Sequence, residues 1–426
     1  MGQRAENNRQ LRTKNRQLPL RSNGLITGMG AWSAGGTDLP TLWKNTLQGY
    51  VAATIETFPH LESALPVYRA SSPRFEGQER AFLRNADRAA HLALAAAHEA
   101  WNHAGLTIGD IPPERIGVII GSARGPINLQ EKYAASPTST DVHERPRPSV
   151  SLYTTFSSIA GLVAKAFKVE GPSFMVSSSC TSAATALHAA LGIIQSGLLD
   201  VVIVGGVEAP LMGSLLEQYQ GTGILSTQQP ATQALTPFDR DRSGTVLGEG
   251  AAFVILESEA SVIRRNASVL GHLKAIALAS QSRYRTGLDP EGTSLQKILH
   301  HSLQEASLLP HDIALLHLHG TGTRLNDLLE SHAVASFFGS LTEQPYACAT
   351  KAITGHTLGA AALFQVVLTL CALRDGIVPP VTNCRSLDPE CSLRLATTNT
   401  TLNRSSKALC LTLGFWGNIS SVILSR

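Results

Sequence analysis

The sequence predicts an α/β protein in which helices cover both faces of a mostly parallel β-sheet. Several short segments are almost continuously apolar, which is typical of strands that are buried on both faces. Longer segments with helical periodicity alternate with them along the chain. The chain has 426 residues, of which 43% are hydrophobic, so it can fill one large core or two fused half-domains.

The N-terminal part begins with a short apolar strand at residues 25–30 and a helix at residues 39–48. Apolar residues then recur at steps of three and four between Ala90 and Trp101, which predicts one long amphipathic helix over residues 81–104. The next elements are expected to be strands at 116–121, 173–177, 201–205 and 251–256 and a helix over 181–196.

The C-terminal part repeats this alternation, so two similar halves are expected, although no sequence repeat demonstrates a duplication. Residues 260–266 are interpreted as a charged connector, and residues 122–150 as a long loop near the site mouth or a subunit contact. We therefore divide the chain into a basic flexible leader at 1–22, an N-terminal half at 23–258 and a C-terminal half at 267–426. The expected elements of the second half are strand 269–279, helix 294–306, strand 313–319, helices 325–338 and 358–374, and a terminal strand pair within 409–424.

Charge and cysteine content argue against several classes of function. Residues 1–22 contain six Lys or Arg and one Glu, so the net charge of +3 leaves −2 for the remainder, without a basic face for nucleic acid. The six cysteines form no CxxC pair, which favours free thiols in a reducing cytoplasm. The longest uncharged helical segments, 181–199 and 357–373, are short for a membrane span, so we expect buried core helices and no membrane.

Cys180 is the candidate nucleophile. It lies between the strand that ends near Ser177 and the helix that begins at Thr181. The first turn of a helix presents free N–H groups and the positive end of the helix dipole, which favours a thiolate. The alternative is a small cysteine packed in the core without a chemical role.

Two histidines in the second half are candidates to join Cys180. His319 ends an apolar strand and enters the loop 320–323, and His356 lies at a turn before a helix rich in small residues. Either one alone would more often be structural, but a thiol with two imidazoles suits acyl transfer and carbon–carbon bond formation. A zinc site formed by His317 and His319 with Asp327 or His356 is the alternative. No further ligand spacing supports zinc, so we expect no metal.

With these residues, three further segments make the sequence similar to β-ketoacyl-acyl carrier protein synthases, the condensing enzymes of the thiolase superfamily. These segments are 85–88, 205–209 and 236–251, and the resemblance extends from about residue 23 to the C-terminus. It implies a thiolase-like fold, in which two similar βαβ-type halves form a five-layer αβαβα core. It also implies a decarboxylative Claisen condensation of an acyl thioester with malonyl-acyl carrier protein, which lengthens the acyl chain by two carbons.

The resemblance assigns roles to the candidate residues. Cys180 becomes the acyl-accepting nucleophile, and its backbone N–H forms an oxyanion hole with that of Phe415, which is also the aromatic gate. His319 and His356 promote decarboxylation of the malonyl thioester and stabilise the enolate. Lys351 organises this histidine pair.

Four more residues complete the implied site. Glu330 is the acidic residue paired with the histidine and lysine network, and Asp327 supports the same network. The hydroxyls of Thr321 and Thr323 hydrogen-bond the pantetheine arm of the carrier. No cofactor is implied, because the substrates arrive on the phosphopantetheine of the acyl carrier protein.

The implied partners are an acyl carrier protein and a second subunit. The second subunit is by default an identical copy, and alternatively a related ketosynthase-like chain. The pathway is a type II fatty acid or polyketide/polyene system. The alternative function is a chain-length-factor-like or partner-dependent subunit of a ketosynthase heterodimer, although such factors generally lack the nucleophilic cysteine that Cys180 supplies here. A pure scaffold protein fits less well.

Three residues depart from the family pattern. Trp416 replaces a glycine in the C-terminal loop, and we expect it to change the gate geometry and acyl selectivity. Gln365 and His317 stand where relatives often carry Glu, which alters the charge of the network. Trp416, Gln365 and the basic leader favour a specialised role over primary fatty-acid elongation.

Overall fold

The structure, a computed structural model, describes residues 24–59, 61–134, 150–281, 289, 291–403 and 406–426. The basic leader expected at residues 1–22 lies outside the described residues, as does the part of the expected long loop at 135–149. The described part of that loop includes a helix, α5 (Ile127–Ala134).

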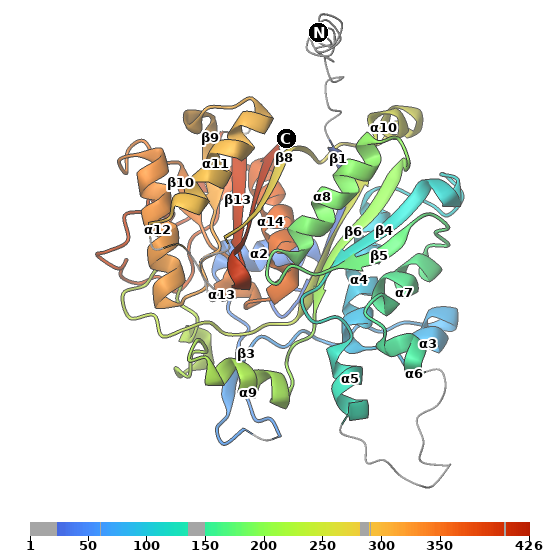
Figure 1. Cartoon of the computed structure of the whole chain (residues 1–426), viewed down its shortest axis with the longest axis horizontal. Coiled ribbons are helices and arrows are strands. Elements are labelled where there is room, and N and C mark those ends of the chain that lie inside the picture. The colour runs from blue at the N-terminus through green and yellow to red at the C-terminus, as the bar shows by residue number, and fades with distance from the viewer. Residues whose placement is uncertain (1–23, 60, 135–149, 282–288, 290, 404–405) are drawn as a thin grey trace, which may run out of the picture.

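Ten strands form one twisted sheet in the order β10-β9-β13-β14-β8-β1-β7-β6-β4-β5 (Figure 1). Two small ribbons accompany it, one of β2 with β3 and one of β11 with β12. The strands of the large sheet are β1 (Gly24–Ser33), β4 (Ile116–Gly121), β5 (Ser173–Val176), β6 (Val201–Glu208), β7 (Gly250–Glu257), β8 (Gly271–Ser280), β9 (Ile313–His317), β10 (Tyr346–Cys348), β13 (Lys407–Leu413) and β14 (Asn418–Ser425). The strands of the ribbons are β2 (Thr54–Glu56), β3 (Leu65–Val67), β11 (Ile377–Val378) and β12 (Thr400–Thr401).

The large sheet consists of two five-stranded halves with the same topology. The N-terminal half has the order β1-β7-β6-β4-β5 and the C-terminal half the order β8-β14-β13-β9-β10. In each half, the strand that comes first in the sequence pairs antiparallel with the strand that comes last, β1 with β7 and β8 with β14. The next pairing in each spatial order is also antiparallel, and the remaining two are parallel. β1 and β8 join the halves through three antiparallel residue pairs, Gly24 with Leu273, Leu25 with His272 and Ile26 with Gly271. The topology therefore shows a repeat that the sequence pattern alone does not demonstrate.

The expectation of a mostly parallel sheet was wrong, because five of the nine strand pairings are antiparallel. Only β4 with β5, β4 with β6, β9 with β10 and β9 with β13 run parallel. β13 and β14 are joined by the short turn 414–417, which can only reverse the chain, whereas parallel neighbours need a crossover. Continuous apolar strands indicate burial on both faces, and they do not indicate strand direction.

Helices complete a five-layer αβαβα arrangement, so the expected thiolase-like fold is confirmed (Figure 1). The middle layer consists of α8 and α14, which contact each other and strands of both halves. Helices α4 and α7 pack on the N-terminal half, and α11 and α12 pack on the C-terminal half. The helices are α2 (Leu39–Gln48), α3 (Gly77–Leu83), α4 (Arg88–His103), α5 (Ile127–Ala134), α6 (Val150–Thr154), α7 (Ser158–Ala166), α8 (Ser182–Gln195), α9 (Gly213–Gly221), α10 (Glu259–Arg265), α11 (Thr293–Ala306), α12 (Arg324–Phe338), α13 (Lys351–Thr354) and α14 (Ala361–Asp375).

Helix α14 is apolar on every side because it lies inside the protein. All of its residues from Ala361 to Leu373 are buried. Within the described residues, the run Leu358–Asp375 is the one helical segment long and apolar enough to cross a membrane, and 89% of it is buried inside the protein. Packing between the two halves of the sheet accounts for this composition, as the sequence analysis expected.

Two local expectations need correction. The helix expected at 81–104 is interrupted, because the Asp87 carboxylate accepts a hydrogen bond of 2.8 Å from Ala89 N and so caps a new helix, α4. The charged connector expected at 260–266 is helix α10, which Ser258 caps at its start through a 3.2 Å bond from Ser261 N. Asn266 ends α10 in the left-handed conformation, with φ of 52°.

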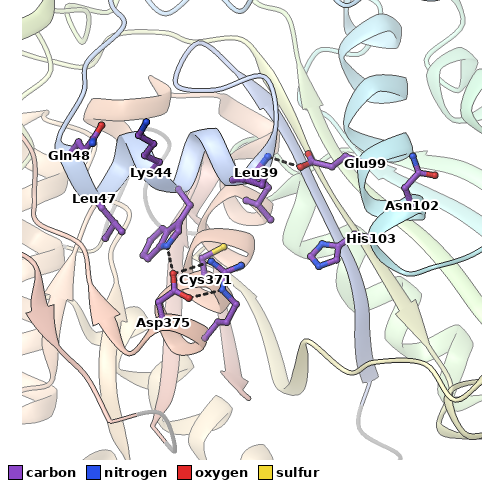
Figure 2. A pocket seen from close by; sticks show the side chains of 12 residues that line it. Leu39, Lys44, Leu47, Gln48, Glu99, Asn102, His103, Cys371 and Asp375 are labelled. Atoms are coloured by element: carbon purple, nitrogen blue, oxygen red, sulfur yellow. Dashed lines mark hydrogen bonds and ion pairs between the residues drawn. The ribbon is translucent and has the colours of Figure 1, made fainter.

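A recess lies between α2, α4 and α14, and its lining residues are distinct from the candidate site residues (Figure 2). Its main polar groups are engaged with the protein itself. The Glu99 carboxylate accepts hydrogen bonds of 2.7 Å from Leu39 N and from Ala31 N, and Trp43 Nε1 donates to Asp375 over 2.6 Å. These bonds join α4 to β1 and to α2, and α2 to α14, so the polar groups of the recess serve to connect these elements.

A buried ionic cluster fixes α10 to the sheet. The Glu257 carboxylate is fully buried and accepts bonds from Arg265 Nη2 at 2.7 Å and Nε at 3.1 Å, from Ser261 Oγ at 3.0 Å, and from Thr27 Oγ1. Thr27 lies on β1 and Glu257 on β7. The cluster therefore connects the segment between the two halves to the middle of the sheet.

Replacing Arg265 tests this cluster. The Arg265→Ala variant should lose about 3–5 kcal/mol of unfolding free energy, because it leaves the Glu257 charge buried without its cation. Urea unfolding followed by circular dichroism measures the change. The neighbouring variant Arg264→Ala is the matched control, since the Arg264 side chain is 52% exposed and its pair with Asp200 should contribute about 1 kcal/mol or less. Equal losses in both variants would contradict a special role for the buried pair.

Candidate active site

Cys180 lies in a tight turn between β5 and α8. β5 ends at Val176 and α8 begins at Ser182, and between them Ser179 adopts a left-handed conformation with φ of 56°. A non-glycine residue in this region is strained, and such strain often occurs beside reactive groups. Ser178 N donates to Ser182 Oγ over 2.9 Å, which stabilises the turn. The Cys180 side chain is 93% buried, with 7% of the residue exposed.

His356 reaches Cys180 because a strand-like segment from the N-terminal half holds its backbone. His356 N donates to Val246 O over 2.8 Å, and Gly248 N donates to His356 O over 3.1 Å. A Cβ on Gly248 would stand 2.4 Å from Thr354 O, so only glycine permits this close approach. The result is a distance of 3.4 Å between His356 Nε2 and Cys180 Sγ. The segment 236–251, noted in the sequence only as family-like, thus positions a catalytic candidate.

His319 joins the same site through the loop that follows β9. Its ring lies 5.3 Å from the ring of His356, nearly perpendicular to it at 85°. The reactive atoms of Cys180, His319 and His356 all lie within 4.8 Å of one another. The structure therefore brings together the three groups that the sequence analysis predicted would converge.

Lys351 determines which nitrogen of His319 carries the proton. Its ammonium lies 3.1 Å from His319 Nδ1 and also donates to His319 O. An ammonium has no acceptor lone pair, so Nδ1 must accept and the neutral imidazole must carry its hydrogen on Nε2. His319 Nε2–H is therefore a donor available to a substrate oxygen.

Acidic side chains of α12 hold the loop that carries His319. The Glu330 carboxylate accepts hydrogen bonds from His319 N at 2.6 Å and Gly320 N at 2.9 Å. The Asp327 carboxylate accepts from Thr321 N at 2.9 Å, from Gly322 N at 3.1 Å, and from Phe238 N at 2.8 Å. Both carboxylates bind main-chain N–H groups, so their direct effect is to fix the backbone of the loop 319–322.

The electrostatics keep both histidines neutral. Burial and the nearby Lys351 charge lower the pKa values of His319 and His356 well below the ordinary range. Burial also lowers the pKa of Lys351 to about 8, while the negative Glu330 opposes that change. Burial raises the pKa of Glu330 to about 8, against the hydrogen bonds from Gly320 and His319.

Burial opposes the thiolate that the helix N-terminus favours at Cys180. Burial raises the pKa of Cys180 to about 12, which exceeds the lowering effect of Lys351. The helix N-terminus is present, but a buried thiolate loses the hydration that a surface thiolate keeps. Cys180 therefore needs a proton acceptor during reaction, and His356 Nε2 lies in the position to be that acceptor.

The remaining site residues lie around the same group. Thr321 Oγ1 and Thr323 Oγ1 are 2.9 Å apart at the end of the His319 loop. Phe415 packs against the apolar cluster that contains Cys180, and its ring stacks on Tyr219 at 6.2 Å. A Cβ on Gly414 would stand 3.2 Å from Cys180 N, so the 414–417 turn directly abuts the nucleophile's amide. The roles of these groups in binding substrate stay predictions.

The three departures from the family pattern have structural explanations. Trp416 keeps a left-handed backbone, with φ of 62° and ψ of 23°, and its side chain is 67% exposed. Gln365 donates to the carbonyls of His317, Leu318 and Leu411, at 3.1, 2.8 and 2.9 Å. Gln365 thus joins β13 to the end of β9. A carboxylate could not replace it, because an ionised carboxylate has no N–H group to donate to these carbonyls.

His317 is a structural histidine and does not join a metal site. Its Nδ1 and Nε2 each lie 2.9 Å from a threonine hydroxyl, of Thr369 and Thr350. Asp327, the other proposed ligand, already binds main-chain N–H groups. The ammonium of Lys351 next to His319 further disfavours a divalent cation among Cys180 and the two histidines, because like charges repel strongly in a buried site.

Comparisons with known proteins agree with this geometry. A family model described as "Beta-ketoacyl synthase, N-terminal domain" matches residues 25–261, and one described as "Beta-ketoacyl synthase, C-terminal domain" matches residues 270–385. The ketoacyl synthase alpha subunit of the tetracenomycin polyketide synthase from Streptomyces glaucescens is 32% identical, over 94% of this chain and 96% of its own. The 3-oxoacyl-acyl-carrier-protein synthase 2 of Staphylococcus aureus is 29% identical, over 94% of this chain and 98% of its own.

A solved structure supports the fold independently. The ketosynthase of Xenorhabdus doucetiae in complex with its chain length factor superposes with a TM-score of 0.82 at 24% identity, covering 96% of this chain and 98% of the solved chain. Fold, site geometry and both family models agree over both halves of the chain. The chain therefore belongs to the β-ketoacyl synthase family of acyl-transferring, carbon–carbon bond-forming enzymes.

Proposed function

We propose that this protein transfers an acyl group from a thioester to Cys180 and condenses it with malonyl-acyl carrier protein, releasing CO2 and adding two carbons. The observation that carries the proposal is the convergence of Cys180 Sγ, His319 and His356 within 4.8 Å. A chain-length-factor-like subunit without catalysis would need neither the thiol nor the ordered imidazoles. This favours a working synthase.

In the loading step, Cys180 Sγ attacks the thioester carbonyl while its proton passes to His356 Nε2, 3.4 Å away. The tetrahedral oxyanion lies against the backbone N–H groups of Cys180 and Phe415, and fixed donors of this kind typically contribute about 10²–10³ in rate. The carbon–sulfur bond to the carrier then breaks. His356 returns the proton to the leaving pantetheine thiolate, so the site is ready for the second substrate.

In the condensation step, the malonyl thioester loses its carboxylate as CO2 and the electron pair forms an enolate. His319 Nε2–H donates to the enolate oxygen, since Lys351 on Nδ1 keeps this tautomer. The enolate carbon attacks the acyl-Cys180 carbonyl, and the Cys180 thiolate leaves and takes up one proton from solvent. The hydroxyls of Thr321 and Thr323 are proposed to hold the pantetheine arm during both steps.

The chemistry uses no cofactor or metal of the protein's own. Support comes from the Lys351 ammonium beside His319. A metal ion bound by His319 would lie close to this positive charge, and the two cations would repel each other. The carrier is inferred from the name of the Staphylococcus relative, a 3-oxoacyl-acyl-carrier-protein synthase. The Streptomyces relative belongs to a polyketide synthase, which supports a type II pathway of specialised metabolism.

A dimer is proposed because β5 ends the large sheet with an unpaired edge among the described residues. Phe174, Met175 and Val176 on that edge are only partly buried, and such an edge favours pairing with another chain. A homodimer is the default, and the alpha-subunit and chain-length-factor complexes among the similar proteins support a heterodimer as the alternative. The free state of all six cysteines supports a cytoplasmic location.

The first test is the reaction itself. Incubation with acyl- and malonyl-acyl carrier proteins should yield a β-ketoacyl carrier two carbons longer, detected by mass spectrometry, and Cys180→Ala should yield none. Cys371→Ala is the matched control, because Cys371 is a free cysteine that lines the recess between α2, α4 and α14, apart from the candidate site residues. Stoichiometric zinc in the purified protein would support the metal alternative instead. Acylation of Cys180 without product from the isolated chain would indicate a partner-dependent subunit.

Alanine variants of His319 and His356 should affect different steps of the reaction. His319→Ala should keep Cys180 acylation and lower condensation by about 10²–10⁴-fold, because His319 contacts the enolate and not the thiol. His356→Ala should lower both steps, since its Nε2 is beside Sγ. Intact-protein mass spectrometry measures acylation, and carrier-bound product measures condensation. His332 on α12 is exposed, so His332→Ala serves as the control and should keep both steps. Equal losses of acylation and condensation in His319→Ala and His356→Ala would contradict the separate roles.

The raised pKa of Cys180 predicts a pH dependence. The reactive thiolate fraction grows about tenfold per pH unit below the pKa, so carbamidomethylation of Cys180 by iodoacetamide should still be accelerating at about pH 9. Peptide mass spectrometry at several pH values gives the rate for this one cysteine. A plateau below about pH 8 would show a thiolate in the resting enzyme, as the helix position alone predicts.

A further inference from the structure

The apolar cluster beside Cys180 contains one pair of polar side chains that the proposed mechanism does not use. Most members of the cluster are aliphatic, and the exception among its buried members other than Cys180 is Tyr219 on α9. Arg124, in the loop after β4, lies over the Tyr219 ring with its guanidinium carbon 5.6 Å from the ring centre. The buried members are Leu65, Val67, Cys180, Leu211, Leu215, Leu216, Tyr219, Leu247 and Leu358.

Arg124 and Tyr219 are connected to Cys180 through a chain of side-chain contacts. The Tyr219 ring stacks on Phe415 at 6.2 Å with 23° between the planes, and Phe415 and Ala123 both pack on the cluster that includes Cys180. Arg124 and Cys180 also interact electrostatically. An acyl chain attached to Cys180 and running into this cluster would therefore meet Arg124 and Tyr219 along one wall.

The pair has more hydrogen-bond donors than acceptors. Within the described part of the chain, the Arg124 guanidinium makes one hydrogen bond, from Nη2 to the Tyr219 hydroxyl at 3.4 Å, and takes part in no ion pair. The Tyr219 oxygen is the acceptor in this bond, so its own O–H remains to donate. Burial raises the pKa of Tyr219 to about 12, so this proton stays on the phenol.

A buried carboxylate holds the Arg124 loop through its backbone and also attracts the Arg124 guanidinium electrostatically. Glu208 is fully buried at the end of β6, and its Oε1 accepts from Ser122 Oγ at 3.0 Å, from Ala123 N, and from Arg124 N at 3.3 Å. These bonds go to the loop backbone and to Ser122, and none goes to the Arg124 side chain. The position of the loop is thereby fixed, while the guanidinium N–H groups of Arg124 make no hydrogen bond to Glu208.

We infer that Arg124 and Tyr219 form a polar clamp that selects acyl primers bearing an acceptor oxygen along the chain, as a keto group or a terminal carboxylate. The inference rests on the proposed function. A saturated chain would leave the O–H of the buried Tyr219 without an acceptor beside the partly buried Arg124 guanidinium, and a buried donor without a partner is unfavourable. A primer oxygen accepts from both groups at once.

The test compares acylation of Cys180 by three thioesters of equal length, hexanoyl, 3-oxohexanoyl and adipyl N-acetylcysteamine. In the wild-type protein, kcat/KM for at least one oxygenated primer should exceed that for hexanoyl by about tenfold to a hundredfold. A preference for 3-oxohexanoyl identifies a keto acceptor, and a preference for adipyl identifies a carboxylate. Intact-protein mass spectrometry measures the acylated fraction over time.

Variants assign the preference to the clamp. Arg124→Met should remove or reverse the preference while Cys180 still accepts hexanoyl, and Tyr219→Phe should reduce it in part. Arg374→Met, a change of the same kind at a partly exposed arginine paired with Asp375, is the control and should keep the wild-type ratio. Equal acylation by all three thioesters in the wild type, or an unchanged ratio in Arg124→Met, would overturn the inference alone. No acylation by any thioester would overturn the proposed function instead.

Discussion

The buried ammonium of Lys351 is the interaction on which the rest of the site depends. It donates to His319 Nδ1 at 3.1 Å, and so it fixes the tautomer that presents Nε2–H to the substrate. Burial lowers the pKa values of His319 and His356, and the Lys351 charge adds to this lowering, which keeps the imidazoles neutral. A charge in this position is tolerated because Glu330 lies nearby within the same buried network. One cation thus fixes the tautomer of His319 and adds to the effect of burial on both imidazoles.

The duplicated fold explains how this network reaches the nucleophile. Cys180 stands at the start of a middle-layer helix of the first half, and His319 and His356 belong to the second half. Because α8 and α14 pack together between the two halves, their N-terminal regions meet in the same place. The β-bridge between Leu247 and His356 then connects the halves directly at the site. Packing in the middle layer and catalysis therefore depend on the same contacts.

The burial that makes this arrangement rigid also changes the chemistry of the thiol. At the surface, a helix N-terminus would favour a Cys180 thiolate, but burial raises its pKa to about 12. The His356 imidazole, whose Nε2 lies 3.4 Å from Sγ, is positioned to accept the thiol proton. Nearby, Glu208 fixes the loop that carries Arg124, so a cation stands beside an otherwise aliphatic wall. The site thus places an imidazole beside the thiol and a cation beside an apolar wall.

The sequence by itself determined the class of fold, most strand and helix positions, and the candidates Cys180, His319 and His356, because apolar periodicity and local motifs are properties of short segments. The family resemblance added Lys351. The sequence did not determine strand direction, the helix break at Asp87, or the protonation of Cys180. It also gave no sign that Arg124 meets Tyr219, which lies 95 residues further along the chain. These features depend on which distant segments become neighbours and on how much water they exclude, and only the tertiary structure decides both.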